Sequence, residues 1–192
     1  MPLRNTPTEY GSVTRTLHWA VFLLFAYQFV GANLMTRLGG GERVLGMGQD
    51  LLYNWHKSVG LVLLLLAFAR VVWRRTTPLP DWSDALVPAE RVLVHRLESM
   101  LYLLMFALPV TGYLFVTAGG YGVKLFGAYD LPAPFGRVEW LASLARWLHV
   151  LLAHAAIVVV AWHLGMVLRK QWVDRAPYLQ RMLPWAGRGR ER

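Results

Sequence analysis

Four long apolar stretches divide this 192-residue chain, at about 17–35, 55–73, 97–118 and 147–168. Each is close to the roughly 20 residues that an α-helix needs to cross the hydrocarbon core of a membrane. Only helices and closed barrels satisfy their backbone hydrogen bonds inside lipid. The pattern therefore predicts an all-α membrane protein: a four-transmembrane-helix bundle in up-down order. We expect a single membrane domain over 1–192, with a basic tail over 169–192.

The distribution of basic residues predicts how the chain is oriented in the membrane and does not indicate binding to nucleic acid. The chain is 56% hydrophobic and 16% charged, and its net charge is +9. Of the twenty Lys and Arg residues, fourteen lie on the side that holds both termini and the connection between the second and third spans; the other six lie on the opposite side. Basic residues concentrate on the cytoplasmic side of membrane proteins, so we expect both termini in the cytoplasm. We expect contact with membrane lipid and no binding of nucleic acid.

The fourth apolar stretch carries three histidines, which are costly inside a membrane and usually mark a functional site. His149 and His163 are fourteen residues apart, so they share one helix face and lie roughly 21 Å apart along the helix axis. That places one imidazole near each edge of the membrane. His154 lies on a different face, and we expect it to be packed or at the lipid interface. The other helices must supply the partners of the first two.

The up-down order decides which histidines lie at the same depth. His18 begins the first span, so it lies near the cytoplasmic face at the level of His163. His56 begins the second span, near the outer face, at the level of His149. We therefore predict an inner pair, His18 with His163, and an outer pair, His56 with His149. His95, before the third span, has no further histidine at its level, and an interfacial position is expected for it.

Two imidazoles at each level, from different helices, fit the axial ligation of haem iron. A zinc site usually has four ligands, and the absence of cysteine excludes thiolate sites and covalent haem attachment. The alternative is a plain bundle whose histidines hydrogen-bond between helices. Arg70, at the depth of the inner pair, suits a haem propionate, although snorkelling to the interface would also explain it. Lys170, seven residues beyond His163, is either on the haem-facing stripe or an ordinary cytoplasmic flank.

Several short motifs occur together in an order that resembles the bacterial cytochrome b561 family, over about Tyr10 to Pro184. They are Leu17-His18-Trp19, His56-Lys57-Ser58-Val59-Gly60, Arg70, Ala107-Leu108-Pro109-Val110-Thr111-Gly112, Trp147-Leu148-His149 with His163, and Gln180-Arg181-Met182-Leu183-Pro184. The resemblance implies a four-helix bundle of the bacterial inner membrane that encloses two non-covalent haems b. It implies that the axial ligands are His18, His56, His149 and His163.

The same resemblance implies a membrane oxidoreductase that passes electrons from superoxide, at the periplasmic face, to ubiquinone. Some relatives are instead cytochrome b subunits that link a periplasmic dehydrogenase or hydrogenase to quinone, and the ligand pattern fits both. Lys57 beside His56 is a candidate for steering the superoxide anion, since the outer side carries six basic and four acidic residues. His95 and Lys170 are candidates for the quinone site near the inner pair.

Overall fold

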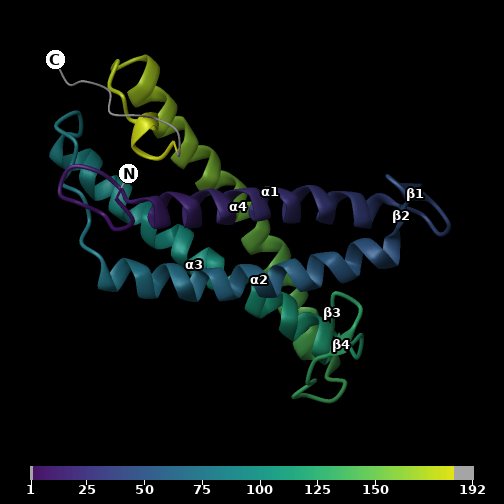
Figure 1. The fold of residues 1–192 in the computed structure, drawn as a ribbon. Helices are drawn as coiled ribbons and strands as arrows, with labels where there is room; N and C mark the ends of the chain where they lie inside the picture. The colour runs from purple at the N-terminus through teal and green to yellow at the C-terminus, as the bar shows by residue number, and fades with distance from the viewer. Residues whose placement is uncertain (1, 184–192) are drawn as a thin grey trace.

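The computed structural model describes residues 2–183 and confirms the all-helical class predicted from the sequence. Four helices, each long and apolar enough to cross a membrane, account for most of the described chain (Figure 1). They are α1 (Ser12–Arg37), α2 (Gln49–Thr76), α3 (Pro88–Ala118) and α4 (Glu139–Trp172), followed by the short 3-10 helix η1 (Leu179–Arg181). Part of the basic tail predicted over 169–192 lies outside the described residues, at 184–192.

Each helix extends beyond the apolar stretch from which it was predicted. The largest displacement of a single end is at the start of α3, which begins at Pro88 instead of near Leu97. Proline is favoured in the first helical turn, and the Glu90 carboxylate accepts a hydrogen bond from the Val87 backbone N–H at 3.1 Å. The apolar pattern reports the part of a helix that crosses lipid, whereas the caps decide where the backbone hydrogen bonds begin.

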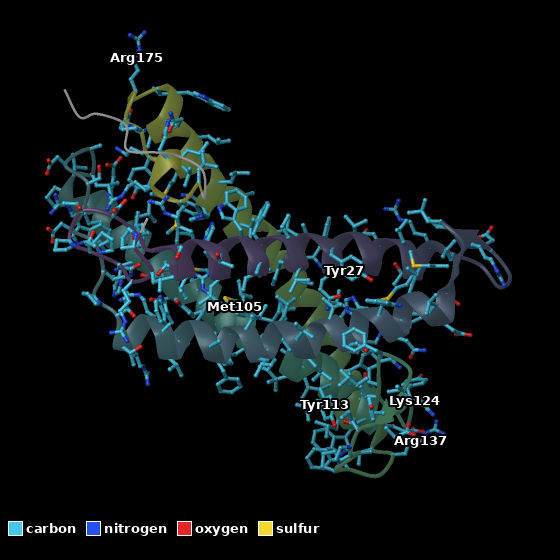
Figure 2. The ribbon with its side chains drawn as sticks, viewed as in Figure 1. Tyr27, Met105, Tyr113, Lys124, Arg137 and Arg175 are labelled. Carbon is cyan, nitrogen blue, oxygen red and sulfur yellow. The ribbon has the colours of Figure 1, made fainter. Side chains whose placement is uncertain are left out.

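Two antiparallel hairpins join the helices at the end of the molecule far from the N-terminus. Strands β1 (Arg43–Val44) and β2 (Met47–Gly48) connect α1 to α2, and β3 (Lys124–Leu125) and β4 (Tyr129–Asp130) connect α3 to α4. Both glycine-rich loops thus become tight turns, with Leu45-Gly46 and Phe126-Gly127 at positive φ. Figure 2 labels Lys124 and Arg137 beside the β3–β4 hairpin and Arg175 at the opposite end.

The helices form two pairs. In Figure 1, α1 and α2 run side by side, and α4 crosses behind them at a steep angle. Among the described residues, α4 packs most extensively against α3, and α2 packs against both α1 and α3. Direct packing of α4 against α1 and α2 is sparse, and the histidine pairs described below connect α4 to these two helices.

The buried apolar side chains form two clusters near mid-bundle. One lies between α3 and α4 and the other joins α1, α2 and α3; their buried members are Leu97, Leu104, Leu108, Ala156 and Val159, and Val21, Leu63, Ala67 and Met105. The remaining apolar surface faces outward. In the most apolar window of α4, only 11% of the residues are buried inside the protein. Such an exposed apolar surface fits a helix surrounded by lipid.

The N-terminal segment, the α2–α3 connection and the C-terminal segment meet at one end of the bundle. The Asn5 side-chain amide donates to Pro78 O at 2.9 Å. On α1, Trp19 Nε1 donates to Met182 O at 2.8 Å, and the buried Arg15 donates to Leu183 O at 2.9 Å. These contacts fix the C-terminal segment against α1, within three residues of His18 along the chain.

Candidate functional site: two histidine pairs

The inner pair joins α1 to α4. The ring centroids of His18 and His163 are 6.2 Å apart, with an angle of 53° between the ring planes, and both side chains are half-buried. The half-buried Arg70 guanidinium on α2 is close enough to interact electrostatically with both imidazoles. It also lies 5.6 Å from the ring centroid of Tyr102. The structure thus brings Arg70 to the inner pair, at the depth predicted for it.

The outer pair joins α2 to α4 and has the same spacing. The ring centroids of His56 and His149 are 6.2 Å apart, and their planes are inclined by 83°. His149 Nδ1 lies 2.9 Å from Leu108 O, which has no proton to give, so a hydrogen bond there requires the proton on Nδ1. That tautomer leaves Nε2 with its lone pair free to bind a metal. His56 Nδ1 is buried and has no hydrogen-bond partner among the described residues.

Local sequence explains how these two rings are positioned. A Cβ atom at Gly112 would lie 3.0 Å from His149 Cε1 and 3.2 Å from its Nδ1, so the absence of a side chain lets the ring lie against α3. Thr111 Oγ1, at 3.3 Å, is a second neighbour of that nitrogen. On the other side, the Gln28 amide of α1 donates to His56 O at 2.9 Å and holds the start of α2.

Gln28 is a site residue that the sequence interpretation missed. Its signal was a carboxamide inside the first apolar stretch, where a polar side chain needs a partner. A Cβ atom at Gly60 would approach the Gln28 Nε2 atom to 3.2 Å, so the glycine leaves room for this contact between α1 and α2.

The other two histidines lie away from both pairs. His154 is exposed on the outer face of α4, and its Nδ1 is 2.8 Å from Val150 O of the same helix. The helical periodicity predicted this separation from the paired face. The His95 side chain on α3 is 68% exposed and lies 3.8 Å from Glu98. The position of His95 does not test the quinone role considered for it, and that role stays a prediction.

Lys170 is buried at the end of α4 rather than projecting to the surface. Its ammonium group donates to Ala85 O at 2.8 Å, Glu90 Oε2 at 2.7 Å and Asp174 Oδ2 at 2.8 Å. All three of its hydrogen-bond donors are thus used, and they connect α4 to the beginning of α3. The hydrogen bond from Lys170 lowers the pKa of Asp174 below its ordinary value. The quinone role of Lys170 stays a prediction. Its three hydrogen bonds also give this residue a structural role, because they connect α4 to the beginning of α3.

Lys57, the candidate for anion steering, is half-buried at the hairpin end. Its ammonium group donates to Gly122 O at 3.3 Å, which directs it towards the second hairpin. Two other basic residues on this side are ion-paired, Lys124 with Asp130 at 3.3 Å and Arg137 with Glu139 at 3.2 Å.

The geometry of both pairs fits bis-histidine metal ligation. An imidazole–metal–imidazole unit with metal–nitrogen bonds of about 2.0 Å places its ring centroids about 6 Å apart. Over residues 2–183, no group of three or more His, Asp or Glu side chains gathers as a candidate metal site. Two imidazoles at each level, a buried imidazole nitrogen without a partner, and the sparse packing of α4 against α1 and α2 all fit a large planar group such as haem.

Fold and site together define a multi-pass membrane protein of the b-type cytochrome class. A family model described as prokaryotic cytochrome b561 matches residues 9–185. Cytochrome b561 homolog 2 of Escherichia coli (strain K12) is 31% identical over 183 residues, covering 95% of each chain. The chain belongs to the prokaryotic cytochrome b561 family. It is therefore a bacterial membrane electron-transfer protein, and the family implies b-type haem.

Two further relatives are more distant and also match along most of their length. The probable superoxide oxidase CybB of Yersinia pestis is 26% identical over 176 residues, which cover 92% of this chain and 96% of that protein. Cytochrome b562 of Cereibacter sphaeroides is 28% identical over 178 residues, which cover 91% of this chain and 94% of that protein. The match thus extends over all four helices.

Proposed function

We propose that this protein carries electrons across the inner membrane through two haems b. The inner haem is held by His18 and His163, and the outer haem by His56 and His149. The observation that carries this proposal is the recurrence of one spacing, 6.2 Å between ring centroids, in two pairs that share α4. When bound, haem b would supply reversible one-electron chemistry, and two histidine ligands for each haem would favour electron transfer over binding of oxygen or substrate.

The chain's own residues position these ligands. The Leu108 carbonyl orients the His149 ring and keeps its proton on Nδ1, which leaves the lone pair of Nε2 free. Gln28 fixes the backbone that carries His56. At the inner level, the Arg70 guanidinium supplies positive charge next to His18 and His163, where it suits the propionate carboxylates of a haem.

The proposed direction of transfer is from superoxide to ubiquinone. With the termini in the cytoplasm, the hairpins and the outer pair lie on the periplasmic side. Each superoxide anion gives up one electron and becomes oxygen, and two electrons with two protons reduce ubiquinone to ubiquinol. Support comes from the name of the Yersinia pestis relative and from the excess of basic over acidic residues on the hairpin side. Lys57 is the proposed residue that attracts the anion towards His56.

Under this proposal quinone would be reduced near His18 and His163, because superoxide would arrive near His56 and His149 on the opposite side of the membrane. The protons for quinol then come from the cytoplasm, and His95 and Lys170 are the proposed polar residues on that side. Lys170 Nζ is bonded to two carboxylates and a carbonyl, so its substitution needs a folding control.

Stopped-flow mixing of the purified, oxidised protein with superoxide tests this direction of transfer. The expected result is fast haem reduction that slows as salt rises, because screening weakens steering of an anion. Lys57→Gln should lower this rate while the haem spectrum stays unchanged. A slow rate that does not respond to salt would remove superoxide as the donor.

The hairpin surface supports a second candidate, a membrane subunit that relays electrons for a soluble periplasmic enzyme. Large apolar or aromatic side chains are exposed on and around the hairpins, with Leu45 90%, Tyr121 71%, Tyr129 71% and Trp140 70% exposed. Exposed apolar groups of this kind are typical of docking surfaces. Co-purification of a periplasmic redox enzyme that reduces the haems would favour this candidate. Reduction of quinone by superoxide with the isolated protein would count against it.

A further inference from the structure

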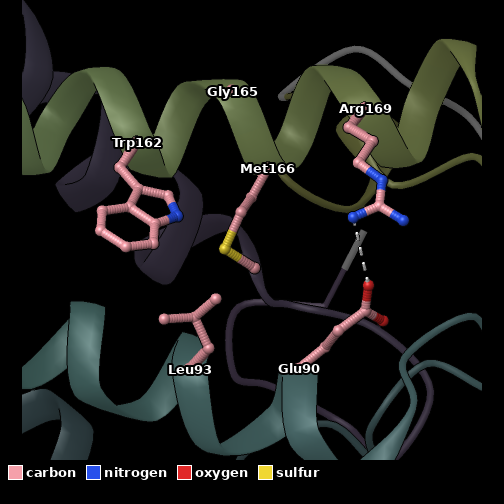
Figure 3. A pocket seen from close by; sticks show the side chains of 6 residues that line it. All are labelled: Glu90, Leu93, Trp162, Gly165, Met166 and Arg169. Carbon is pink, nitrogen blue, oxygen red and sulfur yellow. Dashed lines mark ion pairs between the residues drawn. The ribbon is translucent and has the colours of Figure 1, made fainter.

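A groove opens between the beginning of α3 and the C-terminal part of α4 (Figure 3). Its volume is about 290 Å³, and it is lined by Glu90, Leu93, Trp162, Gly165, Met166 and Arg169. The 34 residues of α4 make a helix about 51 Å long, which exceeds the roughly 40–45 Å thickness of a bilayer with its headgroups. The last turn of α4 and the first turn of α3 therefore reach the headgroup region, and the groove extends from there towards the hydrocarbon core.

Glu90 presents a fixed carboxylate oxygen to the groove. Its Oε2 atom accepts hydrogen bonds from Lys170 Nζ at 2.7 Å and from the Val87 backbone N–H at 3.1 Å. Its Oε1 atom accepts none from residues 2–183, and the side chain is only 18% exposed. A carboxylate oxygen in such a partly buried position needs a donor, so the groove has an open place for a hydrogen-bond donor.

Arg169 provides a positive charge at the same end of the groove. Its Nη1 atom lies 3.9 Å from Glu90 Oε1, which is too long for a hydrogen bond, and its side chain is 64% exposed. Figure 3 shows the two side chains converging from α4 and α3 with this gap between them. The groove thus offers an acceptor and a cationic donor that do not satisfy each other. A ligand that satisfies both carries an ammonium group and an anionic group, which makes it a zwitterion.

The rest of the groove is apolar and lies deeper in the membrane. Trp162 precedes Arg169 by seven residues, about 10 Å along the helix axis. Figure 3 shows Trp162 and Met166 projecting from α4 towards Leu93 of α3. Gly165 lies between them, and a Cβ atom there would meet nothing within 4 Å, so the helix surface is bare. A hydrocarbon chain fits this surface, since Trp162 is 55% exposed and offers its indole face to it.

We propose that this groove binds a phospholipid with an ethanolamine headgroup. The ammonium group donates to Glu90 Oε1, the phosphate accepts hydrogen bonds from Arg169, and an acyl chain lies along the bare surface at Gly165. An ethanolamine ammonium carries N–H donors, whereas a choline headgroup carries none, so Glu90 selects the ethanolamine lipid. A glycerol headgroup leaves the lipid with a net negative charge and no cation for Glu90, and ubiquinone has no charge to pair with Arg169.

Native mass spectrometry of the haem-loaded protein tests this proposal by measuring its affinity for lipids with identical acyl chains. The lipids are phosphatidylethanolamine, its mono- and dimethyl derivatives, phosphatidylcholine and phosphatidylglycerol. Arg169→Gln removes the partner of the phosphate, and Arg175→Gln is the matched control, because it removes the same charge from an exposed position at the same end of the molecule. Gly165→Leu fills the bare surface, and Gly31→Leu on α1 is its control, since a Cβ atom at either glycine meets nothing within 4 Å.

We expect the affinity of the wild-type protein to fall about tenfold between the dimethyl derivative, which keeps one N–H, and phosphatidylcholine, which has none. Arg169→Gln and Gly165→Leu should each bind phosphatidylethanolamine about tenfold more weakly than their controls. This lipid should also raise the thermal unfolding midpoint of the wild-type protein more than that of Arg169→Gln, because a ligand of the native state stabilises it.

The lipid series on the wild-type protein decides the question even if a variant does not fold. Equal affinity for phosphatidylethanolamine and phosphatidylcholine, or tighter binding of phosphatidylglycerol, would overturn the inference. Unchanged binding of phosphatidylethanolamine by folded Arg169→Gln would also overturn it. If ubiquinone displaces the bound ethanolamine lipid from the wild-type protein but not from Gly165→Leu, the groove is a quinone site and the inference is wrong.

Discussion

Replacing Gly112 with alanine should weaken the outer haem site without weakening the helix. The added methyl group would lie 3.0 Å from His149 Cε1, whereas carbon atoms in good contact are about 3.5–4.0 Å apart. The ring must therefore move by about 0.5 Å, away from the Leu108 carbonyl that accepts its Nδ1–H at 2.9 Å. Loss of such an orienting hydrogen bond typically lowers metal affinity by about 10–100-fold, or about 1.4–2.7 kcal/mol.

The expected readout is a selective loss of one haem. Haem titration of the Gly112→Ala variant should show one tight site and one weakened site, with the spectrum of the inner haem unchanged. Alanine favours a helix over glycine by about 1 kcal/mol, so a general loss of helix stability is not expected. Gly31→Ala is the control, since its added methyl group meets nothing within 4 Å. If Gly112→Ala binds two haems with wild-type affinity, the argument for ring placement against α3 is wrong.

Three further predictions concern the end of the molecule that holds the termini. Asp174, whose pKa is lowered by its hydrogen bond with Lys170, contributes stability that is lost as the pH falls below about 4, and Asp174→Asn should flatten this acid limb in thermal unfolding. Trp19→Phe removes the 2.8 Å hydrogen bond to Met182 O and should cost about 0.5–1.5 kcal/mol in denaturant unfolding, while the haem count stays the same. His95→Ala should slow quinone reduction at unchanged haem content and unchanged reduction by the donor; a wild-type rate would exclude a role for this histidine.

The sequence predicts the depth and the face of each span histidine because helical geometry is regular. Fourteen residues return to nearly the same face, so His149 and His163 had to point the same way. Up-down order then assigned His18 and His56 to opposite levels. The structure places these four residues in the predicted pairs. Their role as haem ligands stays a proposal that measurement must test.

Contacts between segments that are distant in the sequence could not be predicted from the sequence pattern. In the sequence, Lys170 looks like an ordinary basic residue at the end of a membrane span. In the structure it donates hydrogen bonds to Ala85 O and Glu90, because α4 ends beside the start of α3. Gln28 bonds to His56 O across two helices, and Trp19 bonds to Met182 O from the far end of the chain. Periodicity identifies which face of a helix is apolar, but it does not identify which neighbour that face meets or at what angle.

The central claim, that two haems lie between the two histidine pairs, is tested most directly by counting haems in alanine variants of the span histidines. The wild-type protein and His154→Ala, whose exposed ring faces away from both pairs, should each bind two haems. His56→Ala and His149→Ala should each lose the same haem, and His18→Ala and His163→Ala should each lose the other, as identified by redox titration. If His154→Ala loses a haem while His149→Ala retains two, the ligand assignment is contradicted.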